Sequence, residues 1–188
     1  MLLGYSQTMR IAITGGIAEG KSTVLRILAD MGHETASSDA YARECFYEAS
    51  VQQGLASLLR LPAPVEPAQL RKALAESSEI RRGVNRLIHP HVVHRIVSSS
   101  AVFVEVPLLI ESCLQSLFEQ VWVVTCGPEE QLRRIVERDG PELAQKLVDS
   151  QLKSFAKTPF GDVVLRTNEG LETVKRNIRH AAKFAVSE

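Results

Sequence analysis

Short runs of consecutive apolar residues alternate along the chain with longer segments whose apolar positions recur at helical spacing. The apolar runs are typical of strands buried in a parallel sheet, and they lie at 10–14, 101–110, 121–125 and 162–165, with a weaker candidate at 33–37. Pro107 is expected to mark the exit from the strand in the run at 101–110. Segments 21–31, 129–138, 143–155 and 171–184 have the helical pattern. This alternation predicts a three-layer α/β fold in which helices flank a mostly parallel sheet.

The middle of the chain has helical spacing without any strand pattern. Segments 45–61, 68–75, 80–87 and 92–97 are predicted helices, and a proline cluster at 62–67 marks a connection. His89-Pro90 is expected to interrupt the last two of these helices. We therefore predict a helical lobe at about 45–97, inserted between the strands.

The helices at 129–138 and 143–155 are joined through Asp139-Gly140-Pro141, which predicts an antiparallel helical hairpin. Such a hairpin can act as a lid over bound nucleotide, at about 133–157. The core then comprises about 9–44, 98–132 and 158–188. The whole of 9–188 forms a single predicted domain, preceded by an N-terminal extension, 1–8, to which we assign no function.

Composition limits the possible partners. The 188 residues carry 22 Lys and Arg against 22 Asp and Glu, so the broad positive charge typical of nucleic-acid binding is absent. The three cysteines are scattered without a CxxC pair, and no apolar run approaches the length of a membrane span. We expect a cytoplasmic protein with no nucleic-acid or membrane partner, and composition does not specify its oligomeric state.

A glycine-rich loop lies between the first predicted strand and the first predicted helix. It has the spacing Gly15-x4-Gly20-Lys21-Ser22, and this strand-loop-helix context favours a phosphate-binding loop over an ordinary glycine turn. Backbone amides of such a loop and the positive end of the following helix bind phosphate oxygens. Lys21 would neutralise phosphate charge, and the Ser22 hydroxyl would be a ligand of Mg²⁺.

Asp39 follows the second predicted strand, 18 positions after Lys21. A βαβ unit brings the end of its second strand to the same sheet edge as the first loop, so this carboxylate can face the phosphate site and act as a base. The alternative is a helix N-cap for 40–44, and spacing alone favours neither function.

Other charged residues are expected at the same edge of the sheet. Glu105 and Glu111 are candidates for organising metal-bound water or substrate, although Glu111 suits a solvated loop equally well. Arg134 and Arg138 are four residues apart on one predicted helix, which would direct both guanidinium groups toward one polyanion.

His89, His91 and His94 are spaced in a way that suggests a metal site. No acidic or cysteine partner lies near them in the sequence. We therefore interpret them as surface or capping histidines rather than metal ligands.

These motifs occur in an order and at separations that resemble the dephospho-CoA kinase family, from about residue 10 to the last helix. The strings that carry the resemblance are Thr14-Gly15-Gly16-Ile17, Gly20-Lys21-Ser22-Thr23, Ser38-Asp39-Ala40 with Ala42-Arg43, His89-Pro90, Val106-Pro107-Leu108-Leu109-Ile110-Glu111, and Gln151 with Lys157. The resemblance implies a P-loop kinase that transfers the γ-phosphate of ATP to the ribose 3′-hydroxyl of dephospho-coenzyme A, the last step of coenzyme A synthesis.

The resemblance also implies residue roles. Asp39 falls at the proposed base, and Lys21 and Arg134 fall at positions near the transferring phosphate. Binding of ATP, the phosphoryl donor, falls to Gly16, Ile17, Ala18, Glu19, Gly20, Lys21, Ser22, Thr23 and, in the lid, Arg138, with Ser22 as a Mg²⁺ ligand. Contact with the acceptor falls to Asp39, His89, Pro107, Leu108, Leu109 and Glu111.

The chain departs from the family pattern at several positions. Ser37-Ser38-Asp39 replaces the common Asp-Ala-Asp, and Glu19 occupies a loop position that is usually small. The lobe is shorter around 62–67, Glu66-Pro67 replaces an Asp-Arg pair, and the lid is trimmed. The alternatives are therefore another P-loop kinase of a small metabolite, nucleoside or nucleotide, or a nucleotide-binding module without catalytic activity.

Overall fold

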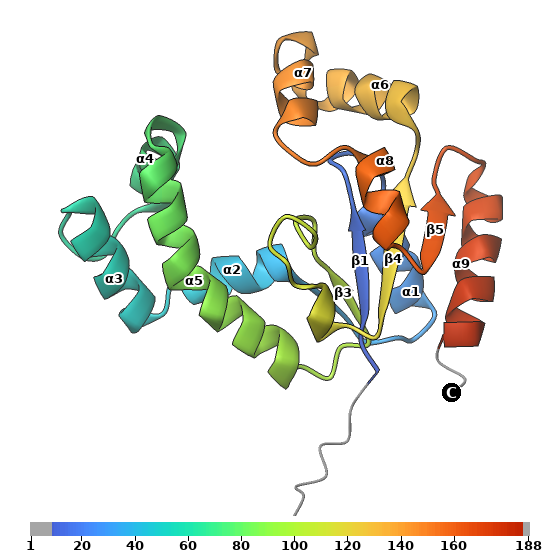
Figure 1. Cartoon of the computed structure of the whole chain (residues 1–188), viewed down its shortest axis with the longest axis horizontal. Helices are drawn as coiled ribbons and strands as arrows, with labels where there is room; N and C mark the ends of the chain where they lie inside the picture. The colour runs from blue at the N-terminus through green and yellow to red at the C-terminus, as the bar shows by residue number, and fades with distance from the viewer. Residues whose placement is uncertain (1–8, 186–188) are drawn as a thin grey trace, which may run out of the picture. The chain divides into compact units, whose positions relative to one another are not determined.

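A computed structural model describes residues 9–185 (Figure 1), so the predicted extension at 1–8 lies outside the described residues. Five strands form one sheet: β1 Ile11–Gly15, β2 Thr35–Ser37, β3 Phe103–Glu105, β4 Gln120–Thr125 and β5 Val163–Arg166. Their order is β2-β3-β1-β4-β5, and every neighbouring pair is parallel. The predicted α/β fold class is confirmed.

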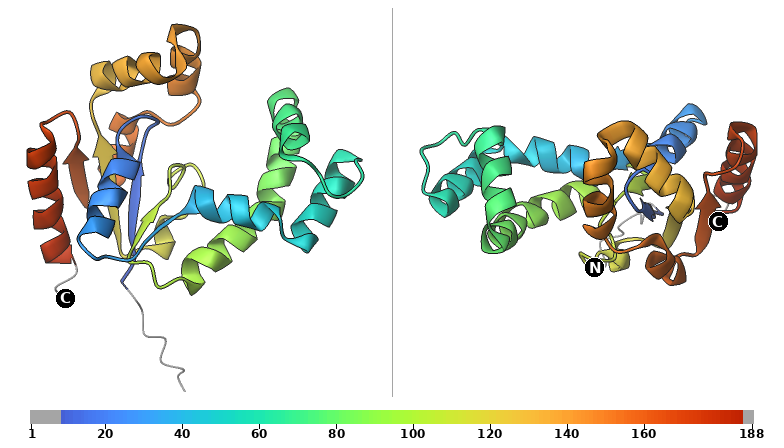
Figure 2. Two further views of the ribbon diagram at one scale, coloured as in Figure 1. Left: turned by 180° about the vertical axis from the view of Figure 1, so that it is seen from behind. Right: turned by 90° about the horizontal axis from the view of Figure 1, so that it is seen from above.

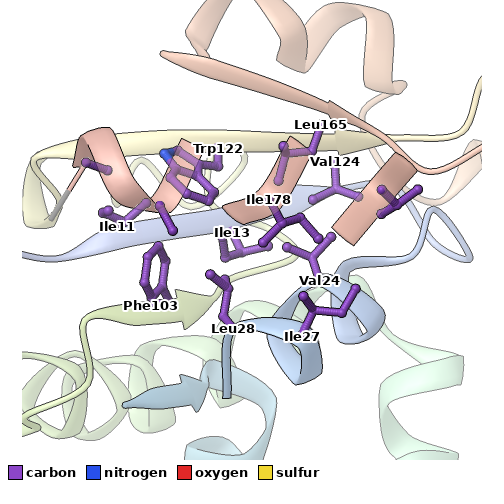
Figure 3. Close-up of a cluster of buried hydrophobic side chains, with 13 residues drawn as sticks. Ile11, Ile13, Val24, Ile27, Leu28, Phe103, Trp122, Val124, Leu165 and Ile178 are labelled. Atoms are coloured by element: carbon purple, nitrogen blue, oxygen red, sulfur yellow. The ribbon is translucent and has the colours of Figure 1, made fainter. Parts of the chain in front are cut away.

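The strands are buried because alternate side chains point into a dense apolar cluster (Figure 3). Ile11 and Ile13 of β1 and Trp122 of β4 are fully buried in this cluster. They pack against α1 (Lys21–Asp30) and α9 (Leu171–Ala185), two helices that contact each other and lie next to one another in Figure 2. These two helices therefore cover one face of the sheet.

Short elements lie against β4 on the opposite face. They are α8 (Ser154–Lys157) and η2 (Thr158–Phe160), and the glycine that follows them, Gly161, lies close to the Val123 side chain. Val123 points away from the cluster that holds Trp122 and Val124, because successive side chains of a strand alternate between faces. Helical elements thus flank both faces of the sheet.

The strand predicted in the run at 101–110, with its exit at Pro107, is shorter in the structure, where β3 spans Phe103–Glu105. The Val106 amide still donates to the Ile13 carbonyl at 2.9 Å, but the chain then enters turns in which Leu109 N–H donates to Val106 O. Pro107 cannot donate a ladder hydrogen bond. The apolar pattern continues past β3 because Leu109 is fully buried in the turn.

The predicted helix at 143–155 is also wrong, because it is two helices. α6 (Pro128–Asp139) is followed by α7 (Pro141–Asp149), and α8 begins only at Ser154. The Leu152 amide donates to the Glu111 carboxylate at 3.0 Å. A helical amide would donate to a carbonyl four residues earlier, so this contact with a distant segment explains the break.

Residues 38–99 form a separate compact helical unit. It contains α2 (Ser38–Phe46), α3 (Ala49–Leu59), α4 (Pro67–Glu76) and α5 (Ser78–Ser98). Its own core includes Phe46, Val51, Leu55, Val65 and Val84. The buried Gln52 amide reinforces this core, because it donates to Phe46 O and accepts from Val65 N–H, both at 2.7 Å.

Two predictions for this unit need correction. The helix predicted at 45–61 is interrupted between Phe46 and Ala49, and α5 continues through Pro90 instead of stopping there. An internal proline removes a helical hydrogen bond. Val84 before it and Val92 after it are both buried, and α5 packs against α2, α3 and α4, so packing holds the helix together. None of the helices within 9–185 is long and apolar enough to cross a membrane.

Candidate active site

The glycine-rich loop connects β1 to α1, as the sequence predicts. Gly20 precedes α1 with φ 93°, in the left-handed region that favours glycine. At Gly15 the reason for glycine is a close approach, since a Cβ there would lie 2.3 Å from the Val124 carbonyl oxygen. Ala18 also has a positive φ, 57°, although it carries a side chain. The loop is therefore tightly curved against β4.

Three donors from two other segments, α6 and the residue that follows β5, hold the loop carbonyls. Ile17 O accepts from Gln131 Nε2 at 2.9 Å, Ala18 O from Arg134 Nη1 at 3.4 Å, and Glu19 O from Thr167 Oγ1 at 2.7 Å. The C=O and N–H of a trans peptide point in opposite directions. The amides of the next residues, 18 to 20, are therefore directed away from these donors, as binding of phosphate oxygens requires.

Lys21 lies across the loop. Its Nζ donates to Gly16 O at 2.8 Å, and the side chain is buried although it is charged. This places a positive charge close to the loop amides and to the N-terminus of α1, where the helix dipole also favours an anion. The loop can therefore neutralise a polyphosphate.

Ser22 and Glu105 bring two oxygen ligands together beside the loop. Ser22 Oγ donates to Glu105 Oε1 at 3.4 Å, and Glu105 ends β3, where the chain lies next to Ile13 of β1. Mg²⁺ prefers oxygen ligands and takes few of them from protein when it binds a nucleotide. Residues 9–185 contain no group of three or more His, Cys, Asp or Glu that could hold a metal.

Arg134 lies against the loop and is oriented by two residues. Its Nε donates to Glu130 Oε1 and its Nη2 to Thr167 O, both at 2.7 Å. The guanidinium groups of Arg133 and Arg134 lower the pKa of the Glu130 carboxyl to about 2. Glu130 therefore stays ionised at neutral pH and remains an ion-pair partner of Arg134. Arg138 instead pairs with the adjacent Asp139, so the two predicted arginines have different partners.

Glu111 forms an ion pair with a buried lysine, Lys157. Lys157 is fully buried, and its Nζ lies 2.9 Å from Glu111 Oε1 and donates to Pro107 O at 2.8 Å. The same Glu111 oxygen accepts the Leu152 amide. Glu111 therefore fastens the turn after β3 to α8, a function that its sequence position did not reveal.

Replacing Lys157 by methionine is expected to lower the free energy of unfolding by about 2 kcal/mol, because the Glu111 carboxylate and the Pro107 carbonyl would both lose their buried donor. Urea denaturation measures the difference. Lys175→Met is the matched control, since Lys175 pairs with Glu172, whose side chain is 80% exposed, and we expect a change below about 1 kcal/mol there. Equal costs for the two variants would contradict the importance of the Lys157 pair.

The remaining predicted acceptor residues belong to two parts of the chain. In the helical unit, Asp39 is exposed in the first turn of α2. This helix begins at Ser38, so Asp39 lies within the helix and is not its N-cap. His89 is partly buried on α5. After β3, Leu108 is 44% exposed whereas Leu109 is fully buried. Leu108 is therefore the more accessible of the two leucines.

The histidine segment has an acidic partner from a distant part of the sequence. His91 Nδ1 lies 2.8 Å from Glu48 Oε2, and Arg95 donates to the other oxygen of the same carboxylate at 2.9 Å. The Arg95 guanidinium holds the pKa of Glu48 below its ordinary value. The contact spans 43 residues, so local sequence could not reveal it.

Gln131 and Thr167 hold the loop, although no sequence motif singled them out. A signal for each was present, because Gln131 lies three residues before Arg134 on the same helix face, and Thr167 follows β5 at the sheet edge that carries the loop.

A Gly-x4-Gly-Lys-Ser loop after β1, in a parallel sheet of order 2-3-1-4-5, defines a P-loop kinase. A sequence model of dephospho-CoA kinase matches residues 9–173. The chain belongs to the dephospho-CoA kinase family, whose members are ATP-dependent kinases.

Individual dephospho-CoA kinases are similar to this chain over most of its length. The dephospho-CoA kinase of Fusobacterium nucleatum is 32% identical over 183 residues, which cover 90% of this chain and 95% of the relative. That of a Synechococcus strain is 35% identical over 177 residues, covering 86% and 85%. The solved dephospho-CoA kinase of Campylobacter jejuni is 22% identical, with a TM-score of 0.64 over 94% of this chain and 96% of that one, and it shares the fold.

Proposed function

We propose that this protein transfers the γ-phosphoryl group of ATP to the ribose 3′-hydroxyl of dephospho-coenzyme A. The main support is the family match over residues 9–173. The phosphate loop is also complete, and Gln131 and Thr167 donate hydrogen bonds to its carbonyls. In the reaction, the bond from the 3′-oxygen to the γ-phosphorus forms, the bond from that phosphorus to the bridging oxygen of ADP breaks, and the hydroxyl proton leaves.

The loop and its neighbours serve the phosphoryl donor in this proposal. The loop from Gly16 to Thr23 binds the phosphates of ATP, and Lys21 and Arg134 offset the charge of the group being transferred. The positions of Lys21 over the loop and of Arg134 beside it support these roles. Arg138, on the exposed end of α6, is the lid residue that would reach bound nucleotide.

Ser22 and Glu105 are the residues that would hold Mg²⁺. When bound, the ion would neutralise charge on the phosphates of ATP. The two oxygens already lie within 3.4 Å of each other, and this supports the assignment.

Asp39 accepts the proton of the acceptor hydroxyl in this proposal. It is an exposed carboxylate two residues after β2, whose last residue, Ser37, pairs with Glu105 in the sheet. The strand thus delivers the chain to the edge at which the phosphate loop also lies. Because Ser37 stands where the family commonly has an aspartate, Asp39 is the carboxylate left for this task.

Contacts with the rest of the acceptor are assigned to His89 and to the segment from Pro107 to Glu111. Within that segment the exposed Leu108 offers an apolar surface. Pro107 and Glu111 define its position through Lys157, and Leu109 anchors it in the core.

A coupled assay of ADP release tests the acceptor. Dephospho-coenzyme A is compared with nucleosides, nucleoside monophosphates and shikimate at equal concentrations, with ATP and Mg²⁺. We expect stimulation by dephospho-coenzyme A alone. Turnover of another acceptor would reassign the protein to a different metabolite kinase, and ATP binding without turnover of any acceptor would indicate a nucleotide-binding module.

A further inference from the structure

The Glu19 side chain is buried inside the phosphate loop. Only 1% of its surface is exposed, and its carboxylate accepts three hydrogen bonds. One oxygen accepts from the Gly16 amide and from the Ser154 hydroxyl, and the other accepts from Thr125 Oγ1 at 3.0 Å. These donors belong to the loop itself, to α8 and to the end of β4.

A buried carboxylate is unexpected in a loop that would bind anions, for two reasons. Burial of a charged group is unfavourable unless hydrogen bonds compensate it. The negative charge also lies close to the site where the loop would bind the phosphates of ATP. The three hydrogen bonds compensate the burial, and they tie the loop to two neighbouring elements.

The same contacts restrict the residues around Glu19. A Cβ at Gly16 would lie 3.0 Å from both Glu19 Oε2 and Ser154 Oγ, and 2.6 Å from Gln131 Nε2. The Glu19 main chain is held as well, because its carbonyl accepts from Thr167. The loop is therefore fixed from inside by a side chain and from outside by donors to its carbonyls.

We propose that Glu19 is a positioning residue that preorganises the phosphate loop for nucleotide and couples it to α8 through Ser154. A loop that already has its binding geometry loses less conformational entropy when ligand binds, so affinity rises without a new contact. The inference rests on the loop binding nucleotide phosphates, which is part of the proposed function. It does not depend on the identity of the acceptor.

Glutamine at this position separates hydrogen bonding from charge. The Gly16 amide can only donate, so the glutamine oxygen has to face Gly16 and Ser154. The glutamine NH₂ then faces Thr125, whose hydroxyl can accept a hydrogen bond instead of donating one. Glu19→Gln can thus keep all three contacts without the charge, whereas Glu19→Ala removes them.

Calorimetric binding of ADP and of ATP, without any acceptor, tests the proposal. We expect Glu19→Ala to raise Kd for both nucleotides by about tenfold or more, as the loss of a charge-assisted hydrogen bond predicts. Glu19→Gln should remain within about threefold of the unchanged protein, in line with retained contacts. Ser154→Ala, which removes only the contact with α8, should raise Kd by about threefold.

Asp162→Ala is the matched control. Its carboxylate also accepts a hydrogen bond from a backbone amide, that of Val121 at 2.7 Å. Asp162 lies where β4 and β5 begin, whereas the loop lies at the other end of the strands, after β1. This variant should lower the melting temperature and leave nucleotide affinity unchanged.

Two results would overturn the proposal. One is a lower melting temperature with unchanged affinity in Glu19→Ala, because Glu19 would then serve only stability. The other is equal weakening by glutamine and alanine, because hydrogen bonding would then not be the cause. If Glu19→Ala does not fold, the Glu19→Gln and Ser154→Ala variants decide, since unchanged affinity in Ser154→Ala would contradict the coupling to α8.

Discussion

Asp39→Asn is expected to bind ATP as the unchanged protein does, and its turnover of dephospho-coenzyme A is expected to fall by about 10²-fold or more. This is the usual contribution of a general base. Asparagine is nearly the same size as aspartate but cannot take the proton of the acceptor hydroxyl. Steady-state kinetics of ADP release, with ATP affinity measured separately by calorimetry, determine both values.

Asp30→Asn is the control for loss of an exposed carboxylate. Asp30 is the last residue of α1, whereas the loop precedes the first residue of that helix. It should leave turnover unchanged. If Asp39→Asn and the unchanged protein turn over at equal rates, Asp39 is not the base.

Lys21→Ala is expected to weaken ATP binding and turnover together, with kcat/KM lower by about 10²-fold or more, as for loss of one group that stabilises transition-state charge. In the proposed mechanism Lys21 acts on the bound nucleotide and on the group in transfer, so we expect its removal to affect both quantities. Its Nζ already lies over the loop, where it donates to Gly16 O. Calorimetry with ATP and the kinetics of ADP release measure the two effects.

Lys175→Ala provides the comparison for loss of a positive charge on the surface, because Lys175 pairs with Glu172 on α9. It should bind ATP normally. Intact ATP affinity in Lys21→Ala would remove Lys21 from the phosphate site and would argue against the role assigned to the loop.

The loop and its flanking elements were predictable because their signals are local. Consecutive apolar residues define β1, glycines permit the curvature, and Lys21 and Ser22 follow at fixed spacing. The parallel sheet also followed from local pattern, because each apolar run is bounded by turn residues. These features depend on neighbours in sequence, and this is why they could be identified before the fold was known.

Other features depend on contacts between distant residues and could not be predicted. By its local sequence Glu111 suits a site carboxylate and a solvated loop equally well, but it pairs with the buried Lys157, 46 positions later. The orientation of Arg134 is another such feature, because it depends on hydrogen bonds to Glu130 and to the distant Thr167. Pro90 reads as a helix end, yet packing of α5 on its neighbours overrides that signal.

Glu19 illustrates the same difficulty within the loop itself. Its position was known to be unusual for a large residue, but the sequence could not show whether the side chain points to solvent, to phosphate or into the protein. The answer depends on Thr125 and Ser154, which lie more than 100 residues away.

Identification of the phosphorylated product tests the central claim most directly. The protein is incubated with ATP, Mg²⁺ and dephospho-coenzyme A, and the product is examined by mass spectrometry and by phosphorus NMR, with Lys21→Ala as the blank. We predict coenzyme A that carries one new phosphomonoester on the ribose 3′-oxygen, formed together with ADP. Recovery of unchanged dephospho-coenzyme A, or a phosphate at another position, would contradict the proposed function.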